Sequence, residues 1–258
     1  NPFRTFNRLK ECRYGRMLYN VNDIYVGRSL DLYGEFSEGE VEVFRKTIRA
    51  GDVVVEAGAN IGAHTVYLAR ETGPQGAVIA FEPQRLVFQT LCANIALNSF
   101  TNVICKQSAV GDAPGTLLVP SLDPARENNF GGLSLLGHSH GEPVPVVRLD
   151  DLGLARCRLL KVDVEGMELQ VLKGAAKLIE RCTPALYVEN DRTENSADLV
   201  RFIDSLNYDA YWHLPPLYNP QNFQRNPDNV FGPTHSINML CLKRGTYGTC
   251  DLPRVQMP

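Results

Sequence analysis

The chain has 258 residues, of which 44% are apolar and 21% charged, and its formal net charge is −3. This length and apolar content fit one α/β domain with a sizeable core, with or without a decorated end. No basic run or Arg/aromatic stripe occurs, and no apolar run approaches the roughly 18 to 20 residues of a membrane-spanning helix, so we expect neither a nucleic-acid nor a membrane partner.

Residues 1–50 predict an N-terminal cap on the main sheet, made of a hairpin and a helix. The segments 15–20 (GRMLYN) and 22–34 (NDIYVGRSLDLYG) flank NVND, an Asn/Asp-rich turn sequence, and predict a short hairpin around it.

A helical pattern follows the hairpin in SEGEVEVFRKTIRAGD. Ser37 is a suitable N-cap, and Glu40 stands three residues later, as in a capping box. Gly51 is expected to end this helix.

Residues 51–244 alternate β-branched apolar segments with helical patterns, which is typical of βαβ units and a mostly parallel sheet. No helical pattern separates the last two strands, so these should pair antiparallel. Residues 113–145 are rich in Gly, Pro, Asn and Ser and predict a loop with short strand pieces. Strands are expected at 52–58, 77–83, 102–112, 157–166, 184–190, 209–214 and 236–243, and helices at 63–72, 85–98, 165–181 and 196–208.

The last segment, 245–258, is predicted to be a frayed C-terminal tail. Seven cysteines occur along the chain, an odd number, without a C-x-x-C pair or zinc-ligand spacing. With a polar N-terminus that lacks the apolar segment of a signal peptide, they indicate reduced thiols in a cytoplasmic protein. Oligomeric state is not predicted.

Ligands of open parallel sheets bind outside the carboxyl ends of the strands. In this sequence Glu56, Glu82, Asp163 and Glu189 each end a strand at that edge. Neighbouring carboxylates repel one another, so the edge favours a ligand that carries positive charge.

The stretch VVVEAGANIGAHT reads as strand, glycine turn and helix, and two nucleotide ligands compete for it. A dinucleotide site follows G-x-G-x-x-G, but here Asn60 takes the place of the second glycine, and Glu56 would face a pyrophosphate. S-adenosylmethionine has no phosphate. Its ammonium suits Glu56, its carboxylate suits the N–H groups of the turn, and Gly58 and Gly62 allow the close approach of a ligand.

Glu82 can accept hydrogen bonds from both ribose hydroxyls, a role that NAD sites share. An NAD-dependent oxidoreductase is therefore an alternative function, although Glu56 and Asn60 disfavour it. A binding module that keeps the cofactor fold without turnover is a further alternative.

Four stretches, VVVEAGANIGAHT, AFEP, LCANIALN and LLKVDVEGMELQVLKGA, resemble the FkbM family of S-adenosylmethionine-dependent methyltransferases in order and spacing. The resemblance extends over about residues 23–243. It implies a Rossmann-like, seven-stranded α/β methyltransferase fold with an antiparallel last strand. It also implies O-methylation of a hydroxyl on a sugar, glycan or natural-product-type acceptor.

The resemblance also implies roles for particular residues. Ser108 would lie near the adenine, and Asp163 would occupy the active-site position after the fourth strand. The family more often has Asp where Glu56 stands, which keeps the charge. The cofactor loop would be formed by Glu56, Gly58, Asn60 and Gly62, with Glu82 on the ribose.

Methyl transfer to a hydroxyl requires removal of the hydroxyl proton, so a general base is expected. The catalytic candidates are Asp163, Glu165, Glu189 and His213, with Asp163 first. The alternative for Asp163 and Glu165 is that of carboxylates that stabilise a helix N-terminus. Asp163, Glu189 and His213 would suit Mg²⁺ or Mn²⁺ if they converged. The sequence does not show convergence, and no metal site is assigned.

The segment 214–235 is long for a loop in a compact domain, and such loops are often functional. Its asparagines and aromatic rings suit a polyhydroxylated acceptor. We expect this loop and the N-terminal hairpin to wall the acceptor pocket. The candidate acceptor contacts are Asn190, Tyr218, Asn222 and Phe223.

Overall fold

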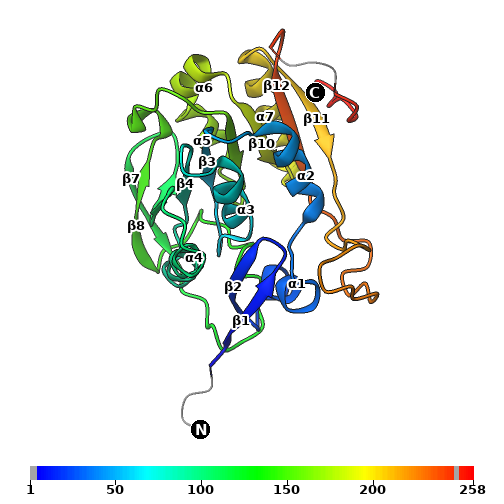
Figure 1. Cartoon of the computed structure of the whole chain (residues 1–258). Helices are drawn as coiled ribbons and strands as arrows, with labels where there is room; N and C mark the ends of the chain where they lie inside the picture. Colours follow the sequence, from blue (N-terminus) through cyan, green and yellow to red (C-terminus); the bar gives the residue numbers. More distant parts are fainter. Residues whose placement is uncertain (1–4, 247–249) are drawn as a thin grey trace.

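The computed structural model describes residues 5–246 and 250–258 (Figure 1). Part of the predicted tail, 247–249, and the first four residues of the predicted cap lie outside this description. No helix within the described ranges has both the length and the apolar character that a membrane span requires.

A seven-stranded sheet forms the centre of the molecule, in the order β11-β12-β10-β9-β3-β4-β5. All neighbours pair parallel except β12, which runs antiparallel to both β10 and β11. The predicted mostly parallel sheet with an antiparallel last strand is therefore confirmed. The strands are β3 (Val53–Ala57), β4 (Ala77–Phe81), β5 (Val103–Lys106), β9 (Leu159–Val162), β10 (Ala185–Glu189), β11 (Tyr208–His213) and β12 (Asn238–Lys243).

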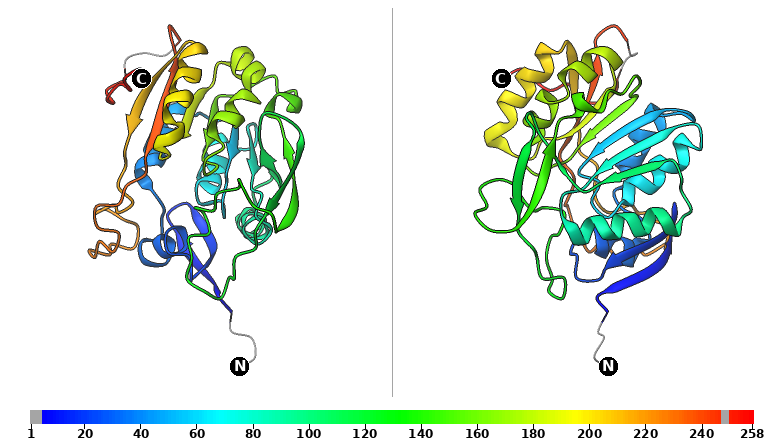
Figure 2. Two further views of the ribbon diagram at one scale, coloured as in Figure 1. Left: turned by 180° about the vertical axis from the view of Figure 1, so that it is seen from behind. Right: turned by 90° about the vertical axis from the view of Figure 1, so that its left-hand side faces the viewer.

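Helices cover both faces of this sheet (Figure 2). Alternate strand residues such as Val55 and Leu160 pack against the helices behind it, and Val54 and Leu159 pack against those in front. The rear layer contains α5 (Glu168–Lys173), α6 (Ala176–Cys182) and α7 (Thr193–Ser205), and the front layer contains α2 (Glu38–Thr47) and α3 (Ala63–Thr72). α4 (Arg85–Leu97) packs against β5 and the N-terminal hairpin.

The region 113–145, predicted to be a loop with short strand pieces, contributes residues to a small second sheet, in the order β6-β8-β7. Its strands are β6 (Ala109–Val110), β7 (Gly115–Val119) and β8 (Glu142–Val147), followed by a 3₁₀ turn at Leu149–Leu152. The expected strand 102–112 is thus divided between the two sheets.

The N-terminal hairpin exists, but its predicted position is wrong. It is formed by β1 (Asn7–Cys12) and β2 (Gly15–Asn20), with Cys12 opposite Gly15 across the turn. NVND leads instead into the helix α1 (Val26–Tyr33), where Asp23 Oδ1 accepts the Tyr25 N–H at 3.0 Å. GRMLYN is therefore the second strand of the hairpin and not the first.

The helix α2 follows Ser37 as predicted, but the capping box is wrong. Ser37 donates its hydroxyl to Glu40 Oε1 at 2.8 Å instead of accepting a backbone N–H. The helix ends at Thr47, before Gly51. Val41 and Phe44 of α2 pack directly on the central sheet. The division into a cap at 1–50, a main domain at 51–244 and a tail at 245–258 stays a prediction.

The expected helix 165–181 is two helices, separated at Gly174. A Cβ atom on Gly174 would lie 2.0 Å from the backbone oxygen of Gly111, so the end of β6 approaches the chain closely there. The apolar residues that recur every four positions through both helices are all buried, namely Met167, Val171, Ala175 and Ile179.

The prediction of a frayed tail is wrong for its last part. Val255 is buried and donates its N–H to Ala210 at 2.9 Å, and Trp212 donates to Pro253 at 2.8 Å. The tail therefore lies along β11, the outermost strand of the sheet.

Candidate functional site

A cleft of about 350 Å³ opens at the carboxyl-end edge of the central sheet. Residues at the ends of β3, β9 and β10 line it, together with parts of α2, α3 and the segments 129–132 and 234–238. We call it the strand-end cleft. Of the predicted site residues, it is lined by Glu56, Gly58, Asn60, Asp163, Glu165 and Glu189.

The turn after β3 is built on left-handed backbone. Gly58 and Gly62 have φ values of 85° and 86°, and Asn60 between them has a φ of 51°. Asn tolerates this region better than most residues because its short side chain can bond to nearby backbone, and here Asn60 Oδ1 accepts the Ile61 N–H at 2.7 Å. Asn in the place of a glycine therefore keeps the shape of the turn.

Gly58 is also where the turn meets the loop after β9. A Cβ atom on Gly58 would lie 1.7 Å from the backbone oxygen of Asp163. Only a glycine allows this approach, which brings the turn and the carboxylate of Asp163 to the same cleft.

Glu82 follows β4 and is 4% exposed. Its carboxylate accepts the backbone N–H of Asn60 at 3.0 Å and that of Gln84 at 2.9 Å. Burial raises the pKa of Glu82 to about 7, although these two N–H groups lower it. Glu82 does not line the strand-end cleft, but it holds the turn that does.

Ser108 lies beyond the end of β5 and is 4% exposed. Its Oγ atom is enclosed and has no hydrogen-bond partner among the described residues. Ser108 does not line the strand-end cleft either. An unpaired buried hydroxyl is unusual, so a ligand group at this position would satisfy it.

Glu56 and Lys161 form a buried pair at the floor of the cleft. Thr65 donates its hydroxyl to Glu56 Oε2 at 2.6 Å, and Lys161 Nζ lies 3.8 Å from Glu56 Oε1. Burial raises the pKa of Glu56 to about 7 against the opposing effect of Lys161. The pKa of Lys161 is raised despite its burial, because Asp163 and Glu56 surround it.

Asp163, Glu165 and Glu189 form a cluster in the same cleft, which we call the acidic cluster. One carboxylate oxygen from each lies within 4.8 Å of the others. Lys161 donates to Asp163 Oδ2 at 3.0 Å, and Arg192 donates to Glu165 Oε2 at 2.6 Å. Glu189 Oε2 is enclosed and accepts no hydrogen bond from the described residues.

Burial and mutual repulsion make this cluster reluctant to ionise fully. Burial raises the pKa of Glu165 to about 7, with a further contribution from Asp163. Burial likewise raises the pKa of Glu189 well above its ordinary value, and the carboxylates around it act in the same direction. The cluster is therefore suited to take up a proton or to receive a positive charge.

Comparisons with known proteins agree with this architecture. Residues 56–210, more than half of the chain, match the Methyltransferase FkbM domain. The chain belongs to the FkbM methyltransferase family. The resemblance predicted from the four sequence stretches is thus confirmed.

Two relatives with similar sequences are Methyltransferase 1 of Beauveria bassiana and 31-O-demethyl-FK506 methyltransferase FkbM of Streptomyces tacrolimicus. They are 34% identical over 143 residues and 33% identical over 159 residues. The matches cover 47% and 49% of this chain, and 57% and 60% of those proteins. The chain therefore spans less than two thirds of the length of these relatives.

Solved structures share the fold. The FkbM methyltransferase of Methylobacillus flagellatus superposes with a TM-score of 0.50 at 21% identity, covering 77% of this chain and 50% of that one. Precorrin-6y C5,15-methyltransferase of Geobacter metallireducens gives 0.51 at 11% identity, covering 79% and 86%. At these identities the likeness shows the fold alone.

Two residues that the sequence analysis placed in the functional site do not line the strand-end cleft. His213 Nδ1 lies 2.7 Å from the Tyr187 hydroxyl, and His213 does not line the strand-end cleft. Asn190 is buried and donates its amide to Ser196 Oγ at 2.9 Å, away from the cleft. Both side chains make hydrogen bonds outside the cleft, and catalysis by His213 and acceptor contact by Asn190 stay predictions.

The loop 214–235 folds onto the N-terminal segment, and its middle does not enter the cleft. Tyr218 packs on Tyr33, and Asn222 is buried and donates its amide to Asn226 at 2.7 Å. Phe223 is 45% exposed. None of Tyr218, Asn222 and Phe223 lines the cleft, and their contact with an acceptor stays a prediction.

The two ends of this loop do form a wall of the cleft. Leu217 and Thr234 line it from the loop, and Ser236 beyond the loop donates its hydroxyl to Glu40 Oε1 at 2.9 Å. Among residues 5–50, the cleft is lined by Tyr25 and Val26 at the start of α1, by Phe36 and by Glu40, and by no residue of the hairpin.

The strand-end cleft also contains residues to which the sequence analysis gave no role in the site. Lys161 was read only as part of an apolar strand, although a lysine between buried residues is itself a signal. Glu40 was read as a capping residue, and Arg192 was not considered. His64 lines the cleft between the Phe36 and Phe44 rings, and burial lowers its pKa to about 3, so it is neutral.

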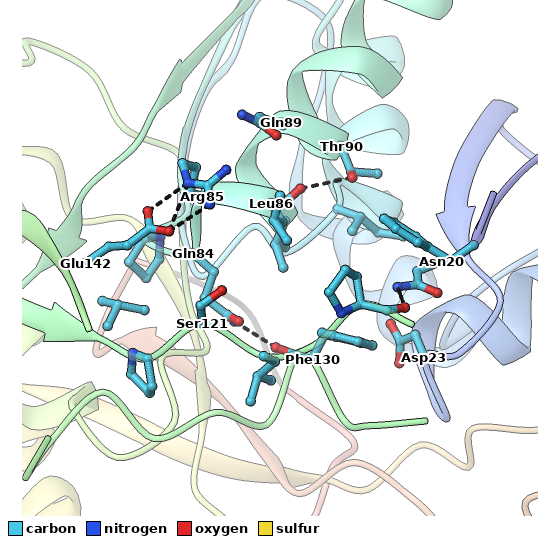
Figure 3. Close-up of a pocket in the computed structure, with 18 of the residues that line it drawn as sticks. Asn20, Asp23, Gln84, Arg85, Leu86, Gln89, Thr90, Ser121, Phe130 and Glu142 are labelled. Atoms are coloured by element: carbon cyan, nitrogen blue, oxygen red, sulfur yellow. Dashed lines mark hydrogen bonds and ion pairs between the residues drawn. The ribbon is translucent and has the colours of Figure 1, made fainter. Parts of the chain in front are cut away.

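A second cavity of about 250 Å³ lies against the first turns of α4 (Figure 3). Arg85 and Glu142 pair at one end of it, and Asn20 and Asp23 lie at the other. Gln84, two residues after Glu82, donates its side-chain amide to the Phe130 carbonyl at 2.7 Å. The cavity lacks the group of strand-end carboxylates, so we place the functional site in the strand-end cleft.

Proposed function

We propose that this chain is an S-adenosylmethionine-dependent methyltransferase that methylates a hydroxyl of a sugar, glycan or natural-product-type small molecule. The observation that carries the proposal is the charge of the strand-end cleft. Two permanent cations line it, Lys161 and Arg192, against six carboxylates. A pyrophosphate would be repelled there, whereas a sulfonium and an ammonium would be attracted. The six carboxylates are Glu40, Glu56, Asp163, Glu165, Glu189 and Asp191.

The residues of the turn suit this cofactor. Glu56 has an enclosed Oε1 atom with no hydrogen bond from the described residues, which supports its role toward the ammonium. The backbone around Gly58 and Asn60 would hold the carboxylate. Each oxygen of Glu82 accepts one N–H and keeps a second lone pair for a ribose hydroxyl. The unpaired hydroxyl of Ser108 supports its place near the adenine.

When bound, S-adenosylmethionine supplies an electrophilic methyl group, which the acceptor oxygen takes as the carbon–sulfur bond breaks and S-adenosylhomocysteine remains. The chain's own part is to orient the acceptor and to remove its proton. We assign proton removal to the acidic cluster, because its carboxylates line the cleft and burial raises the pKa values of Glu165 and Glu189.

The oxygen acceptor is supported by one relative, whose name specifies 31-O-demethyl-FK506 as its substrate. That relative is 33% identical to this chain. All seven cysteines lie in the described ranges as free thiols, which supports the proposed cytoplasmic location.

Ligand binding tests the cofactor first. Thermal shift with S-adenosylmethionine, S-adenosylhomocysteine and NAD should show stabilisation by the first two only. Stabilisation by NAD alone would favour the oxidoreductase alternative and overturn the proposal.

Turnover is then tested by formation of S-adenosylhomocysteine over a panel of sugars, glycosides and polyketide alcohols. Glu189→Gln should lose at least about a hundredfold in turnover with an accepted alcohol, the order expected for loss of acid–base chemistry. The control His213→Gln should stay within about threefold, a change of well under 1.4 kcal/mol in barrier. Binding without turnover on any acceptor would favour the binding-module alternative.

A further inference from the structure

We propose that the acidic cluster binds a divalent cation of the Mg²⁺ or Mn²⁺ type. Asp163, Glu165 and Glu189 each offer one oxygen, and these oxygens lie within 4.8 Å of one another. Oxygens on opposite sides of one such ion, bound at roughly 2.0 to 2.2 Å, are about 4.0 to 4.4 Å apart, so small side-chain shifts would bring these oxygens onto a single ion. Carboxylate oxygens are the ligands that these hard cations prefer.

The neighbours of the cluster orient it toward such an ion. Lys161 holds one oxygen of Asp163, and Arg192 holds one oxygen of Glu165, which leaves the second oxygen of each without a hydrogen bond among the described residues. Lys161 is itself fixed beside Glu56. Contacts of this kind fix the orientation of metal ligands in established sites.

Glu189 gives a second indication that a ligand binds here. It ends β10, and although the whole residue is partly exposed, its Oε2 atom is fully enclosed and accepts no hydrogen bond from the described residues. An enclosed carboxylate oxygen without a partner is costly, and a cation between it and Asp163 would remove that cost.

The charge of the cleft points the same way. Six carboxylates and two cations line it, so acidic side chains outnumber basic ones by four. The proposed cofactor, with an ammonium, a sulfonium and one carboxylate, brings a net charge of only +1. A divalent cation would balance further carboxylates as they ionise, next to the place where the acceptor must bind.

The proposed metal ligands differ from the three residues that the sequence suggested. His213 was grouped with Asp163 and Glu189, but it bonds to Tyr187 outside the cleft, and Glu165 takes the third position. Three protein ligands leave coordination positions for water and for the hydroxyl of the acceptor. A coordinated hydroxyl loses its proton more readily, here to water in the cleft, and the resulting oxygen takes the methyl group as the carbon–sulfur bond breaks. That catalytic role rests on the proposed function, whereas cation binding does not.

Mn²⁺ binding, followed by electron paramagnetic resonance and calorimetry with saturating S-adenosylhomocysteine, tests the proposal. The wild-type chain should bind one Mn²⁺, and Glu189→Gln and Glu165→Gln should each weaken binding at least about tenfold. Glu180→Gln, an exposed change on α6, is the matched control and should bind as the wild type does. Melting curves of each variant verify folding.

Equal Mn²⁺ binding by wild type and Glu189→Gln would overturn the proposal, as would the lack of saturable binding to the wild type. If the wild type binds no cation yet methylates amines, the negative charge serves a cationic acceptor instead. S-Adenosylhomocysteine binding in EDTA should persist, which separates failure of the metal site from failure of the proposed function. Methyl transfer should fall in EDTA and return with Mg²⁺ or Mn²⁺.

Discussion

Asn60 donates its backbone N–H to Glu82 Oε2 at 3.0 Å and so ties the turn after β3 to the end of β4. The bond requires Asn60 to hold its left-handed φ of 51°. Residues that differ in their tolerance of this conformation should therefore differ in cofactor affinity.

Asn60→Val should weaken S-adenosylhomocysteine binding by about tenfold or more, because a β-branched residue in this region costs on the order of 1–3 kcal/mol. Asn60→Gly should stay within about threefold, since glycine adopts the conformation freely. Calorimetric titration of both variants measures the difference. Equal affinities would mean that the turn relaxes without consequence for the ligand.

Gly58→Ala should destabilise the fold far more than Gly51→Ala. The two glycines have similar φ values, 85° and 88°, so the backbone strain of an alanine is matched. A Cβ atom on Gly51 meets nothing within 4 Å, whereas one on Gly58 lies 1.7 Å from the Asp163 oxygen. We expect roughly 1–2 kcal/mol for Gly51→Ala and at least about 3 kcal/mol for Gly58→Ala, measured by urea unfolding. Similar losses would show that the loop after β9 moves aside easily.

At pH 8.5, where Glu56 is ionised in the wild type, Lys161→Met should lower the free energy of unfolding by about 3–5 kcal/mol, because it leaves Glu56 buried without its cation. The double variant Glu56→Gln/Lys161→Met should recover part of this loss, since no buried charge then remains in the pair. Lys177→Met, an exposed change on α6, is the control and should change stability by less than about 0.5 kcal/mol. Additive losses in the double variant would contradict the pairing.

Protonation of Glu56 should contribute to the pH dependence of the free energy of unfolding. Its pKa is about 7 in the folded chain, above the ordinary value of 4.5. Between these two values the folded state binds more protons than the unfolded state, so the free energy of unfolding falls as pH rises toward 7. Glu56→Gln should make this fall shallower by up to about 1.4 kcal/mol per pH unit, as urea unfolding at pH 5.5 and 7 would show. An unchanged slope would mean that Glu56 is ionised throughout this range.

The sequence predicts the sheet and its strand ends well because both depend on local pattern. Buried parallel strands are short apolar runs, and a polar residue such as Glu56 or Asp163 at the end of such a run must lie at the carboxyl edge. The family resemblance, carried by the glycine turn and the stretch around Asp163, is equally local.

The walls of the cleft could not be predicted in the same way, because they depend on where distant segments pack. Asn222 and Phe223 have side chains suited to an acceptor, yet Glu35 binds the backbone N–H of Phe223 at 2.7 Å and holds the loop against the cap. His213 ends its strand as predicted, but its Nδ1 atom forms a hydrogen bond with the Tyr187 hydroxyl. Arg192 meets Glu165 only because β9 and β10 are neighbours in the sheet.

The C-terminal segment that lies along β11 has a consequence for the protein as a molecule in solution. An outermost strand with free backbone groups is a template for pairing with another chain, and here Pro253 and Val255 occupy those groups on Trp212 and Ala210. A version shortened after Lys243 would bare that strand, and self-association through it would follow even though every residue of the cleft stayed in place.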